Sequence, residues 1–239
     1  MNILITGGAS GLGKAMTIRL CQDPKNKVFF TYKSSKEEAG KIESQFSNAE
    51  SFKMDFNSQD SIQQFIDKMP LLNLDVIINN AITGYTQNYF HKMERSIFLD
   101  SFKINVLPVI QLTQQFIKDS RKKKSGKIIT ILTSFIINKP PLGLSEYVAN
   151  KVYLYSLSKS WAVDNSAFGI TSNCISPSIM MTNFTKNIDK RLVEGMIDSN
   201  PNKCLLNEAE VAEAAYFFIN ASSQINGTNF IINAASDLL

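Results

Sequence analysis

Short apolar runs alternate with longer stretches of helical periodicity along this chain of 239 residues. Runs rich in apolar and β-branched residues predict seven strands: Asn2 to Thr6, Val28 to Tyr32, Ser51 to Met54, Val76 to Ile78, Lys127 to Thr133, Ile170 to Ile175 and Phe230 to Ile232. Residues of helical periodicity between them predict five helices: Gly13 to Cys21, Ser58 to Lys68, Asp100 to Lys118, Tyr147 to Phe168 and Glu208 to Asn220. Because alternating strands and helices build parallel sheets, we expect an α/β fold with a doubly wound parallel sheet of about seven strands and helices on both faces.

Length and composition indicate one globular domain spanning residues 1–239, since no Pro/Ser-rich linker or internal repeat divides the chain. Hydrophobic residues make up 44% and charged residues 19%, which is ordinary for a globular protein. The net charge of +4 is mild. The densest basic run, Arg121 to Lys124, precedes Ser125-Gly126, and a solvated loop between a helix and a strand explains it better than a nucleic-acid site.

Cysteine and histidine usage gives no sign of a disulfide framework or a metal site. Cys21, Cys174 and Cys204 are odd in number and lack C-x-x-C spacing, and His91 is the sole histidine. The first residues run directly into glycines without the basic and long apolar segments of a signal peptide. No apolar run approaches the roughly 20 residues of a membrane span. We therefore expect a cytoplasmic protein with no bound metal and no membrane contact.

A glycine-rich turn follows the first predicted strand and leads into the first helix. It reads Thr6-Gly7-Gly8-Ala9-Ser10-Gly11-Leu12-Gly13. Glycines let the backbone turn tightly and approach a pyrophosphate, and the amides of a helix N-terminus favour an anion. The spacing is G-x-x-x-G-x-G, so the loop is either a nucleotide-binding turn or merely a tight connection, and its place after a terminal strand favours nucleotide binding.

Tyr147 and Lys151 are four residues apart, which places a phenol and an ammonium on one face of a helix. A neighbouring cation stabilises a phenolate, so the pair predicts a tyrosine with a lowered pKa that can exchange a proton near neutral pH. Chance also produces this spacing on amphipathic helices, and the rest of the chain has to decide.

Five signals along the chain resemble the short-chain dehydrogenase/reductase family, whose members have one Rossmann-type domain. They are the turn Thr6 to Gly13, Asn79-Asn80-Ala81, the helix residue Asn105, Ser134, and Tyr147 with Lys151. They occur in the family's order, with 147 − 134 = 13 positions from the serine to the tyrosine. The resemblance covers essentially the whole chain.

The resemblance implies an enzyme that transfers a hydride between a nicotinamide and a ketone or secondary alcohol. Tyr147 would donate the proton to the carbonyl oxygen, and Ser134 would hydrogen-bond the same oxygen. Lys151 would lower the Tyr147 pKa and bind the nicotinamide ribose, while Asn105 would hold a water that connects Lys151 to solvent. Each residue also has an ordinary structural alternative, such as a strand end for Ser134 or an interface aromatic for Tyr147.

The resemblance also implies the cofactor contacts. They would come from the turn and from five later parts of the chain: Thr6, Gly7, Ser10, Gly11, Leu12, Gly13, Tyr32, Lys33, Ser34, Asp55, Phe56, Asn80, Ala81, Lys151, Pro177, Ile179 and Thr182. Tyr32 stands where NAD-binding relatives have an acidic residue, and Lys33 and Ser34 could bind a 2′-phosphate. We therefore expect NADP(H), with NAD(H) as the alternative because Ser10 stands where many NADP-dependent relatives have an arginine.

Several positions depart from the family pattern beside the expected cofactor site. Ile82 replaces the glycine that follows Asn-Asn-Ala, and Ser178 follows Pro177 where relatives have glycine. Asn233-Ala234-Ala235 stands where relatives often have Asp-Gly-Gly. A side chain in place of hydrogen can press on the cofactor. A weakly catalytic, nucleotide-binding sensor or scaffold is therefore the second functional class to consider.

The substrate would be a small carbonyl compound or alcohol, possibly bound to a carrier. Residues 180–206 correspond to the family's substrate lid, in which Met180, Met181, Phe184 and Met196 could line a pocket or pack the lid onto the body. The stretch from Asn200 to Ala212 resembles that of 3-oxoacyl-acyl-carrier-protein reductases. A sugar, polyol or secondary-metabolite ketone is the alternative substrate.

Relatives form dimers and tetramers through helices that correspond here to Asp100 to Lys118 and Tyr147 to Phe168, so we expect a homodimer or homotetramer. The apolar residues that could form such an interface are Phe102, Leu107, Val152, Tyr155 and Trp161. Burial of the same side chains against the sheet is the competing use.

Overall fold

The computed structural model describes residues 1–137, 139–180 and 190–236. In this part of the chain seven strands form one sheet in the order β3-β2-β1-β4-β5-β6-β7, and every neighbouring pair is parallel. The strands are β1 Asn2–Ile5, β2 Lys27–Tyr32, β3 Ala49–Lys53, β4 Val76–Asn79, β5 Gly126–Ile131, β6 Ile170–Pro177 and β7 Asn229–Ile232. The predicted doubly wound sheet is confirmed.

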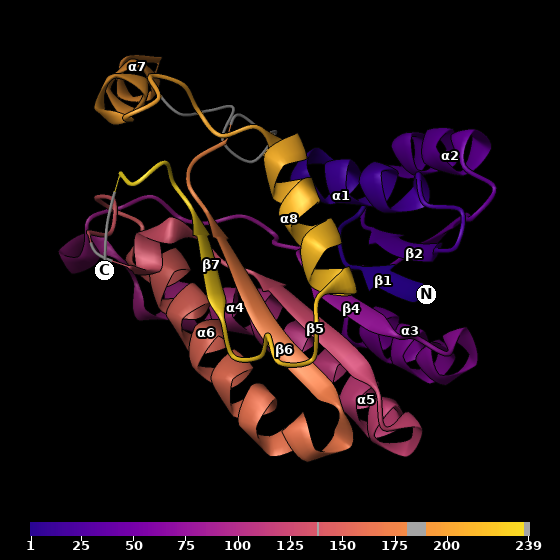
Figure 1. Cartoon of the computed structure of the whole chain (residues 1–239). Helices are drawn as coiled ribbons and strands as arrows, with labels where there is room; N and C mark the ends of the chain where they lie inside the picture. Colours follow the sequence, from indigo (N-terminus) through magenta and orange to yellow (C-terminus); the bar gives the residue numbers. More distant parts are fainter. Residues whose placement is uncertain (138, 181–189, 237–239) are drawn as a thin grey trace.

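Helices cover both faces of this sheet (Figure 1). They are α1 Gly11–Cys21, α2 Lys36–Gln45, α3 Gln59–Leu72, α4 Arg95–Asn105, α5 Leu107–Lys123, α6 Ser145–Asn165, α7 Lys190–Ser199 and α8 Glu208–Asn220. Buried residues of α1, α2 and α8 pack on one face, and those of α3, α5 and α6 pack on the other. In the part of the chain that the structure describes, no helix is long and apolar enough to cross a membrane.

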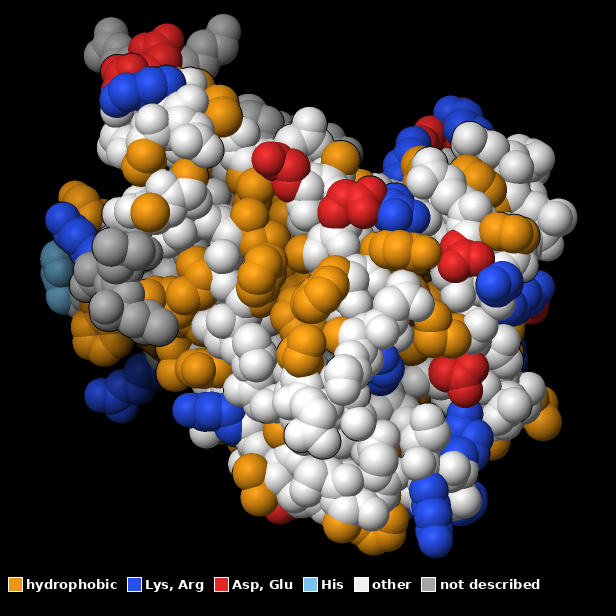
Figure 2. Space-filling view, in the orientation of Figure 1, with side chains coloured by type: hydrophobic (Ala, Val, Ile, Leu, Met, Phe, Trp, Pro, Cys, Tyr) orange, Lys and Arg blue, Asp and Glu red, His pale blue; other side chains and the backbone are white. Residues whose placement is uncertain are grey.

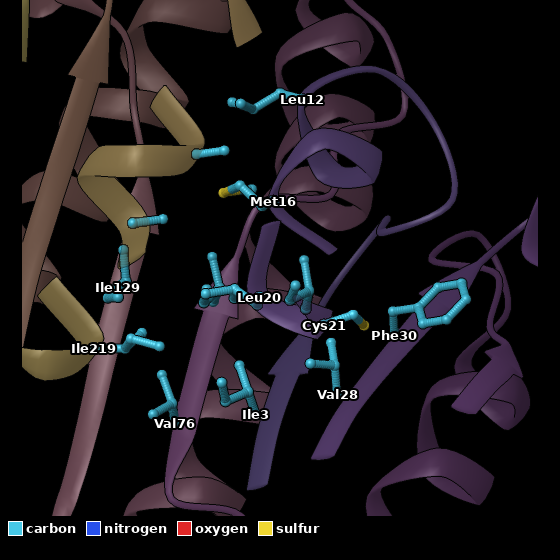
Figure 3. Packing of buried hydrophobic residues seen from close by; sticks show 14 of the residues in the cluster. Ile3, Leu12, Met16, Leu20, Cys21, Val28, Phe30, Val76, Ile129 and Ile219 are labelled. Carbon is cyan, nitrogen blue, oxygen red and sulfur yellow. The ribbon is translucent and has the colours of Figure 1, made fainter. Parts of the chain in front are cut away.

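Strand residues alternate between the two cores because successive side chains of a strand point to opposite faces. In β1, Ile3 and Ile5 pack against α1, whereas Leu4 faces the other side of the sheet. Figure 3 shows Met16 and Leu20 of α1 pointing toward Ile3 and the neighbouring strands. The apolar side chains that alternate along the strands thus pack against the apolar sides of the helices, and this forms one hydrophobic layer on each face of the sheet.

The expected single helix from Asp100 to Lys118 is wrong, because α4 ends at Asn105 and α5 begins at Leu107. Val106 lies between them at φ −115°, and Pro108 stands in the first turn of α5. Proline has no N–H to bond the carbonyl four residues back and its ring clashes there, so a continuous helix is interrupted. The break places Asn105 at a helix end, where its side-chain oxygen accepts the Thr83 amide.

Two helices were not anticipated. Only Ala39 and Ile42 of α2 are buried, so its sequence carries little apolar periodicity. The other, α7, lies within the stretch expected as a substrate lid. Within that stretch, Met181, Thr182 and Phe184 lie outside the described residues, and so does the side chain of Met196.

The direction in which the chain adds strands to the sheet reverses between β1 and β4. Strand β1 pairs with β2 on one side and with β4 on the other. At such a switch point the connections leave the sheet in opposite directions and open a crevice beyond the carboxyl ends of the strands. The glycine-rich turn follows β1, and Asn80 follows β4. The fold therefore brings these two predicted cofactor segments to the same crevice.

Candidate active site

The glycine-rich turn is shaped by backbone contacts that exclude side chains. Gly7 has φ +68°, and a Cβ there would lie 3.1 Å from the Ala81 Cα. A Cβ on Gly13 would lie 2.0 Å from the Gly7 carbonyl oxygen. The Gly8 amide donates to the Thr31 carbonyl at 2.9 Å, which anchors the turn on β2. Glycine is therefore required by the turn itself.

The N-terminus of α1 offers free amides to an anion. Ser10 precedes the helix with an extended backbone, its side chain makes no capping hydrogen bond, and the first turn has no acidic residue. Uncapped amides at a helix N-terminus bind phosphate groups well. Gly11, Leu12 and Gly13 thus fit a pyrophosphate, and NAD(P) is a cofactor that these residues can hold.

Thr6 lies in the interior and connects the ends of β1 and β4. It is fully buried, and its hydroxyl oxygen accepts hydrogen bonds from the backbone amides of Asn80 at 2.9 Å and Ala81 at 3.0 Å. The Asn80 side-chain amide donates back to the Thr6 carbonyl at 2.9 Å. Thr6 and Asn80 therefore hold the crevice in shape by contacts with each other.

The end of β2 brings together the residues expected at the adenosine half of the cofactor. Lys33 is exposed and forms an ion pair with Asp55 at 3.1 Å. The Asp55 pKa lies below its ordinary value because the carboxylate accepts the Asn57 amide and faces Lys33. Tyr32 is partly buried, Ser34 is exposed, and the Phe56 side chain is buried in the core. The cation expected to meet a 2′-phosphate already has a carboxylate partner.

Ser134, Tyr147 and Lys151, three of the predicted catalytic residues, lie near the carboxyl end of β5. Ser134 is buried and begins a 3-10 turn, Ser134–Ile136, because β5 ends at Ile131 rather than at Thr133 as expected. The Lys151 ammonium donates to the Ile131 carbonyl at 2.8 Å and lies 5.9 Å from the centre of the Tyr147 ring. The four-residue step on α6 thus places both side chains at the end of the strand that leads to Ser134.

The expected lowering of the Tyr147 pKa by Lys151 is wrong for the chain without cofactor. Burial raises the pKa of Tyr147 to about 12, more than a hydrogen bond with Thr133 lowers it, and Tyr85 and Glu146 raise it further. Burial also lowers the pKa of Lys151 to about 8, against a raising effect of Cys174. Lys151 points its ammonium at the Ile131 carbonyl, so desolvation decides both values.

A small cavity lies beside the two residues, with a volume of about 10 Å³, which is the room that about one water molecule requires. It is lined by Ala81, Ile82, Asn105, Glu146, Tyr147, Asn150, Lys151 and Leu154. Asn105 and Lys151 therefore share a space of the size that the expected water needs. Ile82, which stands where the family has glycine, forms part of its wall.

Three side chains at this site were not anticipated from the sequence. Glu146 is buried beside Tyr147, Ser101 is buried on α4, and Thr133 hydrogen-bonds Tyr147. The sequence does show an acidic residue directly before Tyr147. A carboxylate on the same helix beside a predicted catalytic residue needs hydrogen-bond donors if it is buried, and this points to polar partners around it.

At the end of β6, Pro177 is buried and pairs with Ile232, and the Ser178 amide donates to the Ile232 carbonyl at 2.8 Å. Ile179 follows with partial exposure. Thr182, the last expected cofactor contact, lies outside the described residues. Among residues 1–137, 139–180 and 190–236, no three His, Cys, Asp or Glu side chains are grouped to hold a metal ion.

Comparison with known proteins finds close agreement in sequence family and fold. The family described as short chain dehydrogenase matches residues 1–192. A 3-oxoacyl-[acyl-carrier-protein] reductase FabG of Buchnera aphidicola is 30% identical over 237 residues, which cover 96% of this chain and 94% of that protein.

Solved structures agree with the fold. A putative gluconate dehydrogenase from Agrobacterium tumefaciens superposes with a TM-score of 0.90 at 19% identity, over 99% of this chain and 96% of that one. A 3-ketoacyl-(acyl-carrier-protein) reductase from Brucella melitensis, complexed with NADH, gives a TM-score of 0.86 at 22% identity, over 99% and 98%. With the family matched over most of its length, the chain belongs to the short chain dehydrogenase family and is an oxidoreductase that acts on carbonyl or CH–OH groups with NAD(P).

Proposed function

We propose that this protein is an NADPH-dependent reductase of a 3-oxoacyl-type ketone. The observation that supports it most is that Tyr147 and Lys151 lie together beside the end of β5, the strand that leads to Ser134. The 30% identity to a 3-oxoacyl-[acyl-carrier-protein] reductase over nearly the whole chain supports the substrate class.

In this proposal the bound nicotinamide supplies the hydride, and the chain supplies the proton and the orientation. Tyr147 donates a proton from its hydroxyl to the carbonyl oxygen. Ser134 donates a hydrogen bond to the same oxygen and stabilises the negative charge that develops there. The raised pKa of Tyr147 keeps its phenol protonated, which suits a donor in the reducing direction.

Lys151 and Asn105 would serve the return of the proton to Tyr147. A Lys151 pKa of about 8 lets the ammonium exchange protons near neutral pH. Both residues line the water-sized cavity, so a water held there could connect them.

For the cofactor we propose NADPH over NADH. The absence of an acidic side chain at Tyr32 removes the repulsion that a 2′-phosphate would meet, and Lys33 and Ser34 are exposed beside it. A bound phosphate would draw Lys33 away from Asp55, since a doubly charged oxyanion competes strongly for one ammonium.

We propose that residues 1–239 act as one catalytic unit in the cytoplasm, with residues 180–206 as the lid over the substrate. The substrate would be small or linked to a carrier. In the described part of this stretch, α7 and the turn at Asn200 precede the capped start of α8 at Asn207, which would give the lid a fixed base.

A nucleotide-binding sensor is the second candidate, and one observation favours it. Ile82 lines the cavity beside Tyr147 where the family has glycine, and a bulky side chain there would oppose a bound nicotinamide. A sensor would bind NADPH without consuming it.

We also propose a homodimer or homotetramer. Leu107 and Val152 are 39% and 45% exposed, as an interface requires, whereas Phe102, Tyr155 and Trp161 pack against the core. A second apolar area lies over α8 and β7 (Figure 2), where Phe217 and Phe230 are exposed and both contact Phe218. Light scattering that finds only monomer would contradict this assembly.

One experiment separates the reductase from the sensor. NADPH and NADH binding are titrated first, and NADPH consumption is then followed with acyl thioesters, diketones and keto sugars. The proposal expects tighter NADPH binding and consumption with a 3-oxoacyl thioester. Binding without consumption across the panel would favour the sensor, and consumption with keto sugars alone would replace the substrate class.

A further inference from the structure

Glu146 is a buried carboxylate that the reaction described above does not use. It directly precedes Tyr147 on α6 and is only 2% exposed. One carboxylate oxygen accepts the Thr86 backbone amide at 2.7 Å, and the other accepts the Ser101 hydroxyl. Glu146 therefore connects the start of α6 to α4 and to the segment 82–86 that follows β4.

The surrounding hydrogen bonds require both oxygens of Glu146 to be acceptors. The Asn105 side-chain oxygen accepts the Thr83 amide at 2.8 Å, so its NH₂ group faces the Ser101 hydroxyl oxygen, at 3.3 Å. The Asn150 side chain donates to the same hydroxyl oxygen at 2.9 Å. With two donors on its oxygen, Ser101 can direct its proton only to Glu146.

The backbone amide of Thr86 is a donor only, so the Glu146 oxygen that it faces must accept its hydrogen bond. Both oxygens of Glu146 thus act as acceptors, and the Thr86 amide and the Ser101 hydroxyl hold this carboxylate inside the protein. An isosteric amide at this position places its NH₂ group against the Thr86 amide or the Ser101 hydroxyl, so it fits only if the Asn150 amide turns round to accept the Ser101 proton.

The segment held in this way flanks the catalytic tyrosine. Ile82 lines the cavity that Tyr147 and Lys151 also line. The Tyr85 ring lies 6.0 Å from the Tyr147 ring, centre to centre, at an interplanar angle of 54°. Because Asn105 and Glu146 bind the amides of Thr83 and Thr86, they fix the backbone on either side of Tyr85.

We propose that Glu146 is a positioning residue of the reductase, whose buried carboxylate holds segment 82–86 against Tyr147. This inference rests on the proposed function. The charged and titratable groups that face Tyr147 are Glu146 and Lys151 on α6 and Tyr85 on segment 82–86, and Cys174 of β6 faces Lys151. Burial is the main cause of the raised Tyr147 pKa, and the negative charge of Glu146 adds to the rise after Tyr85.

The test compares three variants by hydrogen exchange of segment 82–86 and by the pH profile of kcat/KM for ketone reduction. Glu146→Gln removes the charge and one acceptor. Ser101→Ala removes a partner of the carboxylate but keeps the charge. Asp164→Asn makes the same charge change at an exposed position of the same helix and is the matched control.

Glu146→Gln is expected to lower kcat/KM by at least about tenfold, since small displacements in an active site have large effects on rate. Exchange in segment 82–86 should be faster. Reduction fails at high pH once Tyr147 ionises, and loss of the negative charge lowers that pKa, so the alkaline limb should move to lower pH. Ser101→Ala should speed exchange but leave the limb in place, and Asp164→Asn should change neither.

Unchanged exchange and rate in Glu146→Gln would overturn the proposal, and a slower enzyme with an unmoved alkaline limb would reduce Glu146 to a structural support and overturn it as well. If Glu146→Gln does not fold, unchanged exchange in Ser101→Ala overturns it. An unsubstituted protein that reduces no ketone contradicts the proposed function, while the exchange measurements still decide whether Glu146 holds the segment.

Discussion

Two segments flank the crevice at the switch point of the sheet, and they are built in different ways. The turn from Thr6 to Gly13 owes its shape first to close backbone approach, since a Cβ on Gly13 would meet the Gly7 carbonyl at 2.0 Å, and the side chains of Thr31 and Asn80 add hydrogen bonds to it. Segment 82–86 instead owes its position to side chains, with its amides bonded by Asn105 and Glu146.

This difference has a chemical consequence. A backbone-built turn presents amides to a pyrophosphate, a ligand shared by NAD and NADP, and it tolerates little change. A segment held by side chains can be re-aimed by a single substitution. Where the family has glycine, Ile82 now lines the cavity at Tyr147. Binding of the cofactor and selection of the substrate are therefore expected to respond to different substitutions.

The largest effect is expected from Tyr147→Phe. This substitution changes the part of the crevice beside segment 82–86 and leaves the glycine-rich turn as it is. Loss of the proton donor should lower the rate of ketone reduction by about 10²- to 10⁴-fold, because general acid catalysis contributes that much. NADPH affinity, measured by fluorescence titration, should stay the same. Tyr153→Phe, at a 45% exposed position of the same helix, is the control and should retain full activity. An active Tyr147→Phe enzyme would contradict the assignment.

Gly13→Ala should instead damage the turn and remove both binding and turnover. The added methyl collides with the Gly7 carbonyl and should lower the free energy of unfolding by about 1–3 kcal/mol. Gly40→Ala on α2 is the matched control, because its Cβ meets nothing within 4 Å. Denaturant unfolding should find that variant about 0.5–1 kcal/mol more stable, since alanine is the better helix former. Equal stabilities for the two variants would show that the turn has room to spare.

Lys151→Met tests the burial of the ammonium through the pH dependence of stability. The Lys151 pKa is about 8 in the folded protein and 10.5 ordinarily, so between these values the unfolded chain binds more protons and stability rises with pH. The stability of the unsubstituted protein relative to the variant should therefore increase from about pH 8 to about pH 10.5, by at most about 1.4 kcal/mol per pH unit. Below pH 8 the difference should level off. A flat difference in urea unfolding across this window would show that Lys151 is solvated.

The smallest effect is expected from Lys33→Ala, which changes only the adenosine end. NADPH affinity should fall by about tenfold through loss of one charge-assisted bond, and NADH affinity should not fall. Lys103→Ala, an exposed lysine of α4, serves as the control. Equal losses for NADPH and NADH would mean that Lys33 supports the fold through Asp55 and does not select the phosphate.

The same contrast explains what could be predicted from the sequence. The parallel sheet could be predicted from the periodicity of apolar residues. The glycine-rich turn could be predicted because no other residue type fits its backbone, so the glycines themselves mark it in a single sequence. The single helix predicted from Asp100 to Lys118 does not take account of Pro108, which is the sequence signal for the break at Val106. Glu146 and Ser101 are 45 positions apart and of ordinary type, and nothing before folding indicates that they meet.

Protonation at the site could not be predicted either. The spacing of Tyr147 and Lys151 suggested a lowered phenol pKa, but the value depends on how far both groups leave water and on where the ammonium points. Those are properties of the packed molecule.

In the proposed reaction the chain moves a hydride from NADPH to a carbonyl carbon while Tyr147 protonates the oxygen. NADPH that carries deuterium at the transferred position, incubated with a 3-oxoacyl thioester, tests this step by mass spectrometry of the product. We predict a 3-hydroxyacyl product with one deuterium at the carbinol carbon, formed by the unsubstituted protein and not by Tyr147→Phe. Unlabelled product, or none although NADPH binds, would contradict the account.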